Sequence, residues 1–161
     1  MRKLVIGDKN LSSWSLRPWL ALRVAGLPFA ELSIRLGQPE SKAGILRYSP
    51  SGKVPCLIEG ELLIWDSLAI CEYAAELAPE LWPADAAARA EARAVSAEMH
   101  SSFTALRQNM PMNVCAEKPG VGRTPETEAD IERIGHADAA VHLHGFLHRE
   151  RCGRPRLRLG H

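Results

Sequence analysis

The chain has few of the features that mark membrane, secreted and nucleic-acid-binding proteins. Its uninterrupted apolar runs are only a few residues long, far below the ~20 that a membrane-spanning helix needs. Only Leu4, Val5 and Ile6 separate the basic start of the chain from Gly7, which is too little for the apolar part of a signal peptide. The net charge is +1, and no basic stripe runs through the body of the chain. We therefore expect a cytoplasmic protein with no membrane and no nucleic acid among its partners.

Cysteine is scarce and scattered. Cys56, Cys71, Cys115 and Cys152 form no Cys-x-x-Cys pair. In a cytoplasmic chain such thiols stay reduced, so the sequence predicts free and mostly buried cysteines.

What the chain does contain is the composition of an ordinary globular protein. With 161 residues, 46% of them hydrophobic and 24% charged, it can form one domain or two small ones. Short apolar runs bounded by Gly, Pro and Ser predict strands at 3–6, 29–36, 54–58 and 62–65. Helical spacing and capping residues predict helices between these strands and after them, which begin near Ser12, Lys42 and Asp66. The order β-α-β-α-β-β-α predicts an α/β fold with a mixed sheet covered by helices.

The second half of the chain changes in composition. Two prolines bracket a linker over 78–84, and Ala, Glu and Arg then predict one long helix to about Asn109. The start of a further helix is expected over 127–134. An apolar stripe on the long helix packs the core or lines part of a pocket, and it comprises Met99, Phe103, Leu106 and Met110.

The segment Ser12-Ser13-Trp14-Ser15 stands between a predicted strand and a predicted helix. A hydroxyl there lies near free helix N–H groups and the positive end of the helix dipole, an environment that favours an anion such as a thiolate. A plain N-cap explains the same residues. A Ser-His-Asp triad is not indicated, because His100 is in the middle of a predicted helix and the other histidines follow residue 135.

Two further segments carry polar chemistry. Lys53-Val54-Pro55 opens a strand, and a cis Val54–Pro55 bond would leave the Val54 backbone free to pair with an extended peptide. Asp66-Ser67 begins the third helix, where Ser67 and backbone amides can hold a carboxylate and Asp66 can accept an ammonium group. The alternatives are an ordinary proline at a strand start and an ordinary helix cap.

Taken in this order, the motifs resemble those of the soluble glutathione S-transferases over residues 1–110. Tyr48-Ser49-Pro50-Ser51-Gly52-Lys53-Val54-Pro55 is similar to that family's Asn-Pro-x-Gly-Lys/Gln-Val-Pro segment. Asp66-Ser67-Leu68-Ala69-Ile70-Cys71-Glu72-Tyr73 is similar to its Glu/Gln-Ser-x-Ala-Ile-x-x-Tyr segment. Ser12-Ser13-Trp14-Ser15 most resembles the Ser-Ser-Cys-Ser start of the zeta class, with Trp14 where that pattern has Cys.

The resemblance implies a thioredoxin-like domain over 1–78, a linker over 79–84 and a partial all-helical domain over 85–134. It implies glutathione as co-substrate, a homodimer and no metal. Catalytic roles would fall to Ser12 and Ser13, one of which would donate a hydrogen bond to the glutathione sulfur. Val54, preceding Pro55, would pair with the cysteinyl part of glutathione and Lys53 would neutralise its glycine carboxylate. Asp66 and Ser67 would hold the γ-glutamyl end.

The function implied is therefore a detoxification-type glutathione transferase that activates the thiolate for conjugation or isomerisation of a small electrophile. Serine rather than cysteine at the helix start favours these reactions over thiol–disulfide exchange. Arg107 could meet an anionic substrate. The alternatives are a glutathione-binding module without turnover, because the helical domain is incomplete, and a dimerisation platform with the same fold.

Residues 135–161 form an atypical His- and Arg-rich tail. Three interpretations compete for it: a shifted reading frame or truncated gene product, a genuine divergent tail, and a metal site. The last rests on the pattern formed by His142, His144 and His148, which lacks Cys or acidic ligands at suitable spacing.

Overall fold

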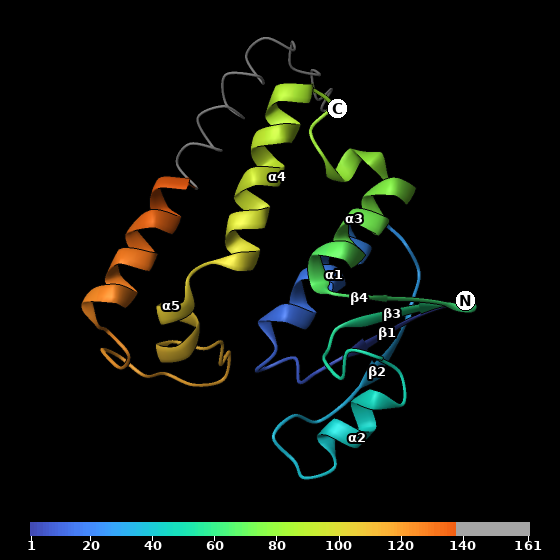
Figure 1. Ribbon diagram of the computed structural model, residues 1–161, viewed down its shortest axis with the longest axis horizontal. Coiled ribbons are helices and arrows are strands. Elements are labelled where there is room, and N and C mark those ends of the chain that lie inside the picture. Colours follow the sequence, from blue (N-terminus) through green and yellow to red (C-terminus); the bar gives the residue numbers. More distant parts are fainter. Residues whose placement is uncertain (138–161) are drawn as a thin grey trace, which may run out of the picture.

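A computed structural model describes residues 1–137 of the chain (Figure 1). The elements follow one another as β1 (Arg2–Ile6), α1 (Ser13–Val24), β2 (Ala30–Ser33), α2 (Ser41–Leu46), β3 (Cys56–Glu59), β4 (Leu62–Trp65) and α3 (Ser67–Leu77). This is the β-α-β-α-β-β-α order that the sequence predicts, so the expected α/β, thioredoxin-like domain is confirmed. A short 3-10 turn (Pro79–Leu81) leads to α4 (Ala86–Ser101) and α5 (Thr104–Asn109).

The four strands form one mixed sheet in the order β2-β1-β3-β4. β1 pairs with β2 in parallel, with Lys3 opposite Ala30, because α1 returns the chain to the same end of the sheet. β1 pairs antiparallel with β3, and β3 pairs antiparallel with β4 through a turn at Gly60, whose φ of 62° suits glycine.

The core lies where α1 and α3 pack together against the sheet, while α2 stands apart from them (Figure 1). Its buried members are supplied by β1, α1, β3 and α3: Leu4, Ile6, Leu22, Leu57, Ile70 and Ala74. β1 and β3 are the central strands, so burial of their apolar side chains fixes the register of the sheet. The register in turn fixes the positions of the loops that leave the strand ends.

The expected long helix over 84–109 is wrong in one respect, because the structure breaks it into α4 and α5. Phe103 takes a left-handed conformation with φ of 65° and buries its side chain, which remains 7% exposed. Arg107 reaches back from α5 and donates to the carbonyls of Met99 and Ser102 at the end of α4. Carbonyl groups at a helix end have no backbone N–H partner in the next turn. The Arg107 side chain supplies the donors that the backbone N–H groups of a continuous helix would have supplied.

A further helix begins at residue 125 and is described as far as residue 137. Its first turn is capped by Thr124, whose hydroxyl accepts from Thr127 N at 3.2 Å. Asn109 and the fully buried Thr127 join this helix to α5 through a 3.0 Å hydrogen bond. The predicted start of a helix over 127–134 is confirmed, and this helix continues into the first three residues of the expected tail. The rest of that tail, including the histidine pattern, lies outside the described residues.

No helix within residues 1–137 combines the length and the apolar character needed to cross a membrane.

Candidate functional site

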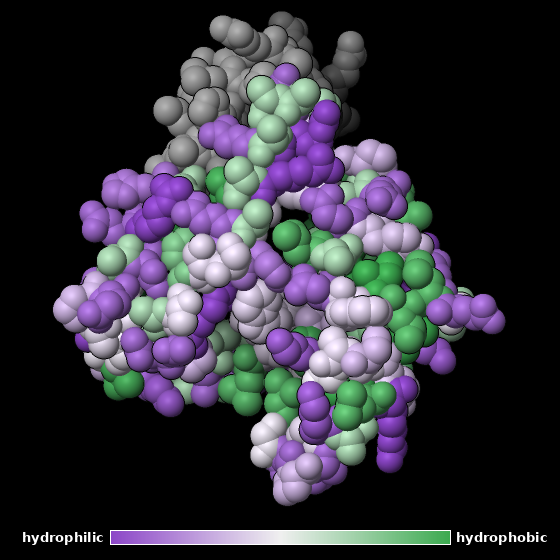
Figure 2. Space-filling model, in the orientation of Figure 1, coloured by the Kyte–Doolittle hydropathy of each residue, from purple (hydrophilic) through white to green (hydrophobic). Residues whose placement is uncertain are grey.

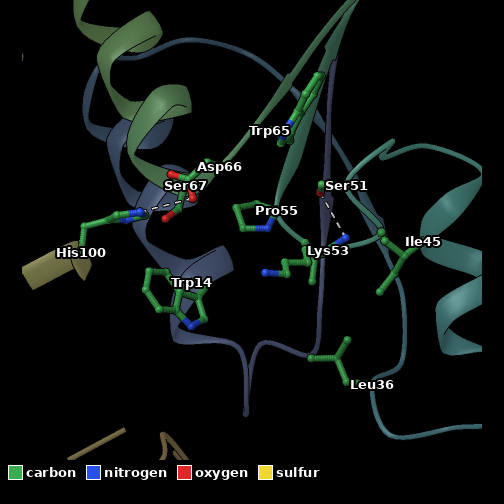
Figure 3. A pocket seen from close by; sticks show the side chains of 12 residues that line it. Trp14, Leu36, Ile45, Ser51, Lys53, Pro55, Trp65, Asp66, Ser67 and His100 are labelled. Carbon is green, nitrogen blue, oxygen red and sulfur yellow. Dashed lines mark hydrogen bonds and ion pairs between the residues drawn. The ribbon is translucent and has the colours of Figure 1, made fainter. Parts of the chain in front are cut away.

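A cleft of about 870 Å³ opens beside the sheet, where segments far apart in the sequence meet (Figure 3). Trp14 of α1, the loop over 51–55, the turn from β4 into α3 and His100 of α4 contribute to its walls. Five of the predicted site residues line it together: Lys53, Val54, Pro55, Asp66 and Ser67.

The N-terminus of α3 forms one wall of this cleft. Asp66 is the N-cap, and its Oδ1 accepts from Leu68 N at 2.8 Å. Ser67 is 2% exposed, and its hydroxyl has no hydrogen-bond partner among residues 1–137. A buried hydroxyl without a partner is rare in folded proteins, and here it stands beside the free N–H groups of a helix start. This arrangement suits an anionic group such as a carboxylate.

The loop that leads into β3 forms a second wall. The Val54–Pro55 bond is cis, as the sequence suggested, and Pro55 is buried just before the strand begins at Cys56. Neither the N–H nor the C=O of Val54 is hydrogen-bonded within the part of the chain that the structure describes. These groups can pair with an extended peptide-like ligand, as the edge of a sheet pairs with an added strand.

Lys53 supplies a cation to the same cleft. Its backbone N–H donates to Ser51 Oγ at 3.2 Å, which orders the turn. Its side chain is exposed, extends into the cleft in Figure 3 and forms no ion pair with any described residue. A free ammonium group at a peptide-binding edge is suited to a carboxylate.

The two predicted catalytic serines lie at the start of α1, and the structure makes them unequal. Ser12 is the N-cap and is 6% exposed. Its Oγ donates to Ser15 Oγ at 2.9 Å and accepts from Ser15 N at 3.3 Å, while Ser15 Oγ also accepts from Gly7 N. Ser13 is half-buried, and its hydroxyl is without a hydrogen bond in residues 1–137. The α1 residue that lines the large cleft is Trp14, whereas Ser12 lines a smaller cavity of about 120 Å³.

Close packing nevertheless connects Ser12 with the cleft. A Cβ added at Gly7 would meet Leu36 Cδ1 at 2.7 Å and Ser12 Cβ at 3.1 Å, so Leu36 and Ser12 both approach Gly7 closely. Leu36 is itself a wall of the cleft. Gly7 therefore lies between Ser12, at the positive end of α1, and this wall.

Trp14 is the centre of a cluster that sequence reasoning did not assign. The guanidinium carbons of Arg17 and Arg107 lie 4.4 Å and 4.5 Å from its ring centroid, and His100 meets it edge-on at 5.3 Å. Burial, and then the charge of Arg107, lower the pKa of Arg17. Arg107 thus packs behind Trp14 and braces the end of α4, so it is not among the residues that line the cleft.

His100 is a second residue of this cleft for which the sequence predicted no role beyond its place in a helix. Its Nε2 lies 3.3 Å from Asp66 Oδ2, which joins α4 to the cap of α3 (Figure 3). A histidine inside a helix carries no local signal for such a role, because the pairing depends on how α4 packs beside α3.

The thiols of Cys56 and Cys71 are not activated. Burial raises the pKa of Cys56, and burial also raises the pKa of Cys71 to about 11. Cys56 is buried as predicted, Cys71 is half-buried, and Cys115 is exposed, contrary to the expectation of mostly buried cysteines. Since the thiolate is the reactive form, any thiolate chemistry in this cleft needs a thiol from the ligand. No group of three His, Cys, Asp or Glu side chains gathers as a metal site within residues 1–137.

The family model "Glutathione S-transferase, N-terminal domain" matches residues 11–77. Glutathione S-transferase 1 of Dianthus caryophyllus is 33% identical over 122 residues, which are 74% of this chain and 55% of the relative. A solved bacterial maleyl pyruvate isomerase of the zeta class is 31% identical, with a TM-score of 0.58 over 65% of this chain and 50% of that chain. A Burkholderia glutathione transferase homologue with bound glutathione is 28% identical, with a TM-score of 0.57 over 66% and 60% of the two chains. The chain spans about half the length of the curated relatives it matches.

Proposed function

Because the chain belongs to the glutathione S-transferase family, we propose that its cleft binds glutathione and activates the thiol for reaction with a small electrophile. The observation that carries this proposal is the buried, unpartnered hydroxyl of Ser67 at the start of α3. It shares one cleft with the unpaired backbone of Val54 and the free ammonium of Lys53. A hydrogen-bond donor site, a strand-pairing site and a cation match the parts of a γ-glutamyl tripeptide.

Each part of glutathione then has a partner. The γ-glutamyl carboxylate accepts from Ser67 and the first N–H groups of α3, and the α-ammonium binds Asp66. The cysteinyl backbone pairs with Val54 beside Pro55, and the glycine carboxylate meets Lys53. Ligand charge is thus held at both ends, which positions the thiol between them.

The thiol is activated at the start of α1. A hydroxyl hydrogen bond from Ser12, with Ser13 beside it, stabilises the thiolate relative to the thiol, and the helix dipole adds to this. We assign the main role to Ser12, whose oxygen is held at the helix start by Ser15 N. Its one hydrogen is donated to Ser15 Oγ in the structure, so this hydrogen turns to the thiolate when glutathione binds. The thiolate then attacks an electrophilic carbon and forms a carbon–sulfur bond. In a substitution on a halogenated aromatic, the carbon–halogen bond then breaks and halide leaves, whereas in an addition the electron pair of the double bond takes a proton from solvent. In an isomerisation the addition gives an enolate, rotation about the former double bond follows, and the enolate re-forms the double bond by expelling the thiolate.

Calorimetry with truncated ligands tests the binding half of this proposal. We expect glutathione to bind more tightly than either γ-glutamylcysteine or cysteinylglycine. γ-Glutamylcysteine lacks the glycine carboxylate and so loses the contact with Lys53, and cysteinylglycine lacks the γ-glutamyl group and so loses the contacts with Asp66 and Ser67. Ser67→Ala should weaken glutathione and γ-glutamylcysteine but leave cysteinylglycine unchanged. Glu128→Gln, a change on the distant helix that begins at residue 125, is the matched control. Equal binding of all three ligands, or none in a folded sample, would contradict the proposal.

Turnover separates a transferase from a binding module. We expect conjugation of 1-chloro-2,4-dinitrobenzene, measured by absorbance, and we would test maleylpyruvate as an isomerisation substrate because a zeta-class relative isomerises it. Binding without turnover of either compound would favour the non-catalytic module.

We also propose that the protein is a homodimer. Large apolar side chains remain exposed on the edge strand β4 and at the end of α3, namely Leu62, Leu63, Trp65 and Leu77. Figure 2 shows hydrophobic side chains gathered over this region. An exposed apolar patch at a sheet edge is typical of an association surface. Light scattering should give twice the mass of the chain, and Leu63→Lys should reduce it to the monomer.

A further inference from the structure

His100 brings the helical segment into contact with the proposed ammonium site. Its Nε2 lies 3.3 Å from Asp66 Oδ2, and the other carboxylate oxygen is already engaged by Leu68 N at 2.8 Å. The Asp66 side chain is therefore held from two elements, its own helix α3 and the neighbouring α4. Two separate partners fix the rotation of the carboxylate.

The surroundings of His100 fix the ring in turn. Trp14 meets it edge-on, with the ring planes at 81°, and the His100 side chain is only 28% exposed. Its Nδ1 is shielded from solvent and has no partner among the described residues.

The contact with His100 leaves part of the hydrogen-bond acceptor capacity of Oδ2 unused. A carboxylate oxygen carries two acceptor directions, so an ammonium group can bind the second while His100 holds the first. Asp66 is 48% exposed on its side chain, which leaves this second direction open to the cleft that both residues line.

We infer that His100 is a positioning residue for the α-ammonium of the ligand and makes the cleft selective for peptides with a free γ-glutamyl amino group. This inference rests on the proposed function, because it concerns the same cleft. His100 acts through Asp66, and it makes the helical segment part of glutathione recognition.

The test compares glutathione with its deaminated analogue, in which the α-amino group is replaced by hydrogen. We expect His100→Ala to weaken glutathione binding about 3- to 10-fold, as loss of one polar contact that orients a charged group would. It should leave binding of the deaminated analogue unchanged. His100→Gln, which keeps an N–H donor, should restore most of the glutathione affinity. His136→Ala, at an exposed histidine, is the matched control.

The outcomes separate this inference from the function on which it rests. Equal loss for both ligands would assign His100 a merely structural role, and tighter glutathione binding in His100→Ala would make it a competitor of the ammonium. Either result would overturn the inference while glutathione binding stands. No binding of glutathione to the wild-type chain would instead overturn the proposed function. The deaminated analogue also reports whether His100→Ala is folded, since its binding needs the rest of the cleft.

Discussion

Replacing Ser12 by alanine should change two quantities that can be measured separately, the folding stability of the free protein and the thiol pKa of bound glutathione. In the free protein the Ser12 hydroxyl caps α1 by accepting from Ser15 N at 3.3 Å. Loss of such a cap costs about 1 kcal/mol of folding free energy. In the proposed complex the hydrogen that Ser12 Oγ donates to Ser15 Oγ in the free protein turns to the glutathione thiolate. A hydrogen bond to a charged acceptor contributes about 1.5–3 kcal/mol.

The second loss appears in the titration of the ligand. Since 1.36 kcal/mol corresponds to a tenfold change, Ser12→Ala should raise the thiol pKa of bound glutathione by about one to two pH units. Thiolate absorbance in the ultraviolet, followed against pH at saturating glutathione, measures this directly. Turnover near neutral pH should fall about 10- to 100-fold, because less of the ligand is thiolate.

Ser13→Ala is the matched comparison. Ser13 is half-buried and makes no hydrogen bond in residues 1–137, so its loss should change folding stability little. We expect a rise in the thiol pKa of less than about one pH unit, because water can approach this hydroxyl. The reasoning is refuted if both variants keep the wild-type thiol pKa and rate. A large rise in Ser13→Ala alone would transfer the catalytic role to Ser13.

Three further changes test the charges. Asp66→Asn keeps the cap on Leu68 N and tolerates the φ of 79° but removes the negative charge, so calorimetry should show glutathione affinity lowered roughly 10-fold with little change in melting temperature. Lys53→Gln should weaken glutathione only about 2- to 5-fold at this exposed site, and titrations at two salt concentrations should show a smaller salt dependence than the wild type. The pKa of Glu31 is lowered from an ordinary 4.5 to about 2, mainly because Lys9 donates a hydrogen bond to its carboxylate. The stabilisation from Glu31 is therefore full above pH 4.5 and is lost as the pH falls towards 2, so urea unfolding should show Glu31→Gln less stable than wild type at pH 7 and equal to it near pH 2.

Much of the first domain could be predicted from the sequence because its signals are local. Gly26 and Gly60 end a helix and close a hairpin with positive φ, and Asp66 caps α3, as their residue types indicate. The break after α4 could not be predicted in this way. The residues around Phe103 are compatible with a helix, and the break depends on the contacts that Arg107 makes across it.

The same distinction between local signals and tertiary packing applies to the site. Lys53, Val54, Asp66 and Ser67 fall in short motifs, and the structure brings all of them to one cleft. The place of His100 depends on the packing of α4 beside α3, which no short motif encodes.

Glutathione binding to the wild-type chain is the most direct test of the central claim. Calorimetry and thiolate absorbance should be recorded on one preparation, over a pH range that spans the thiol titration of free glutathione. The account predicts binding together with a bound thiol whose pKa lies below that of free glutathione. Binding with an unchanged thiol pKa would contradict activation at α1, and no binding in a demonstrably folded sample would contradict the proposed site as a whole.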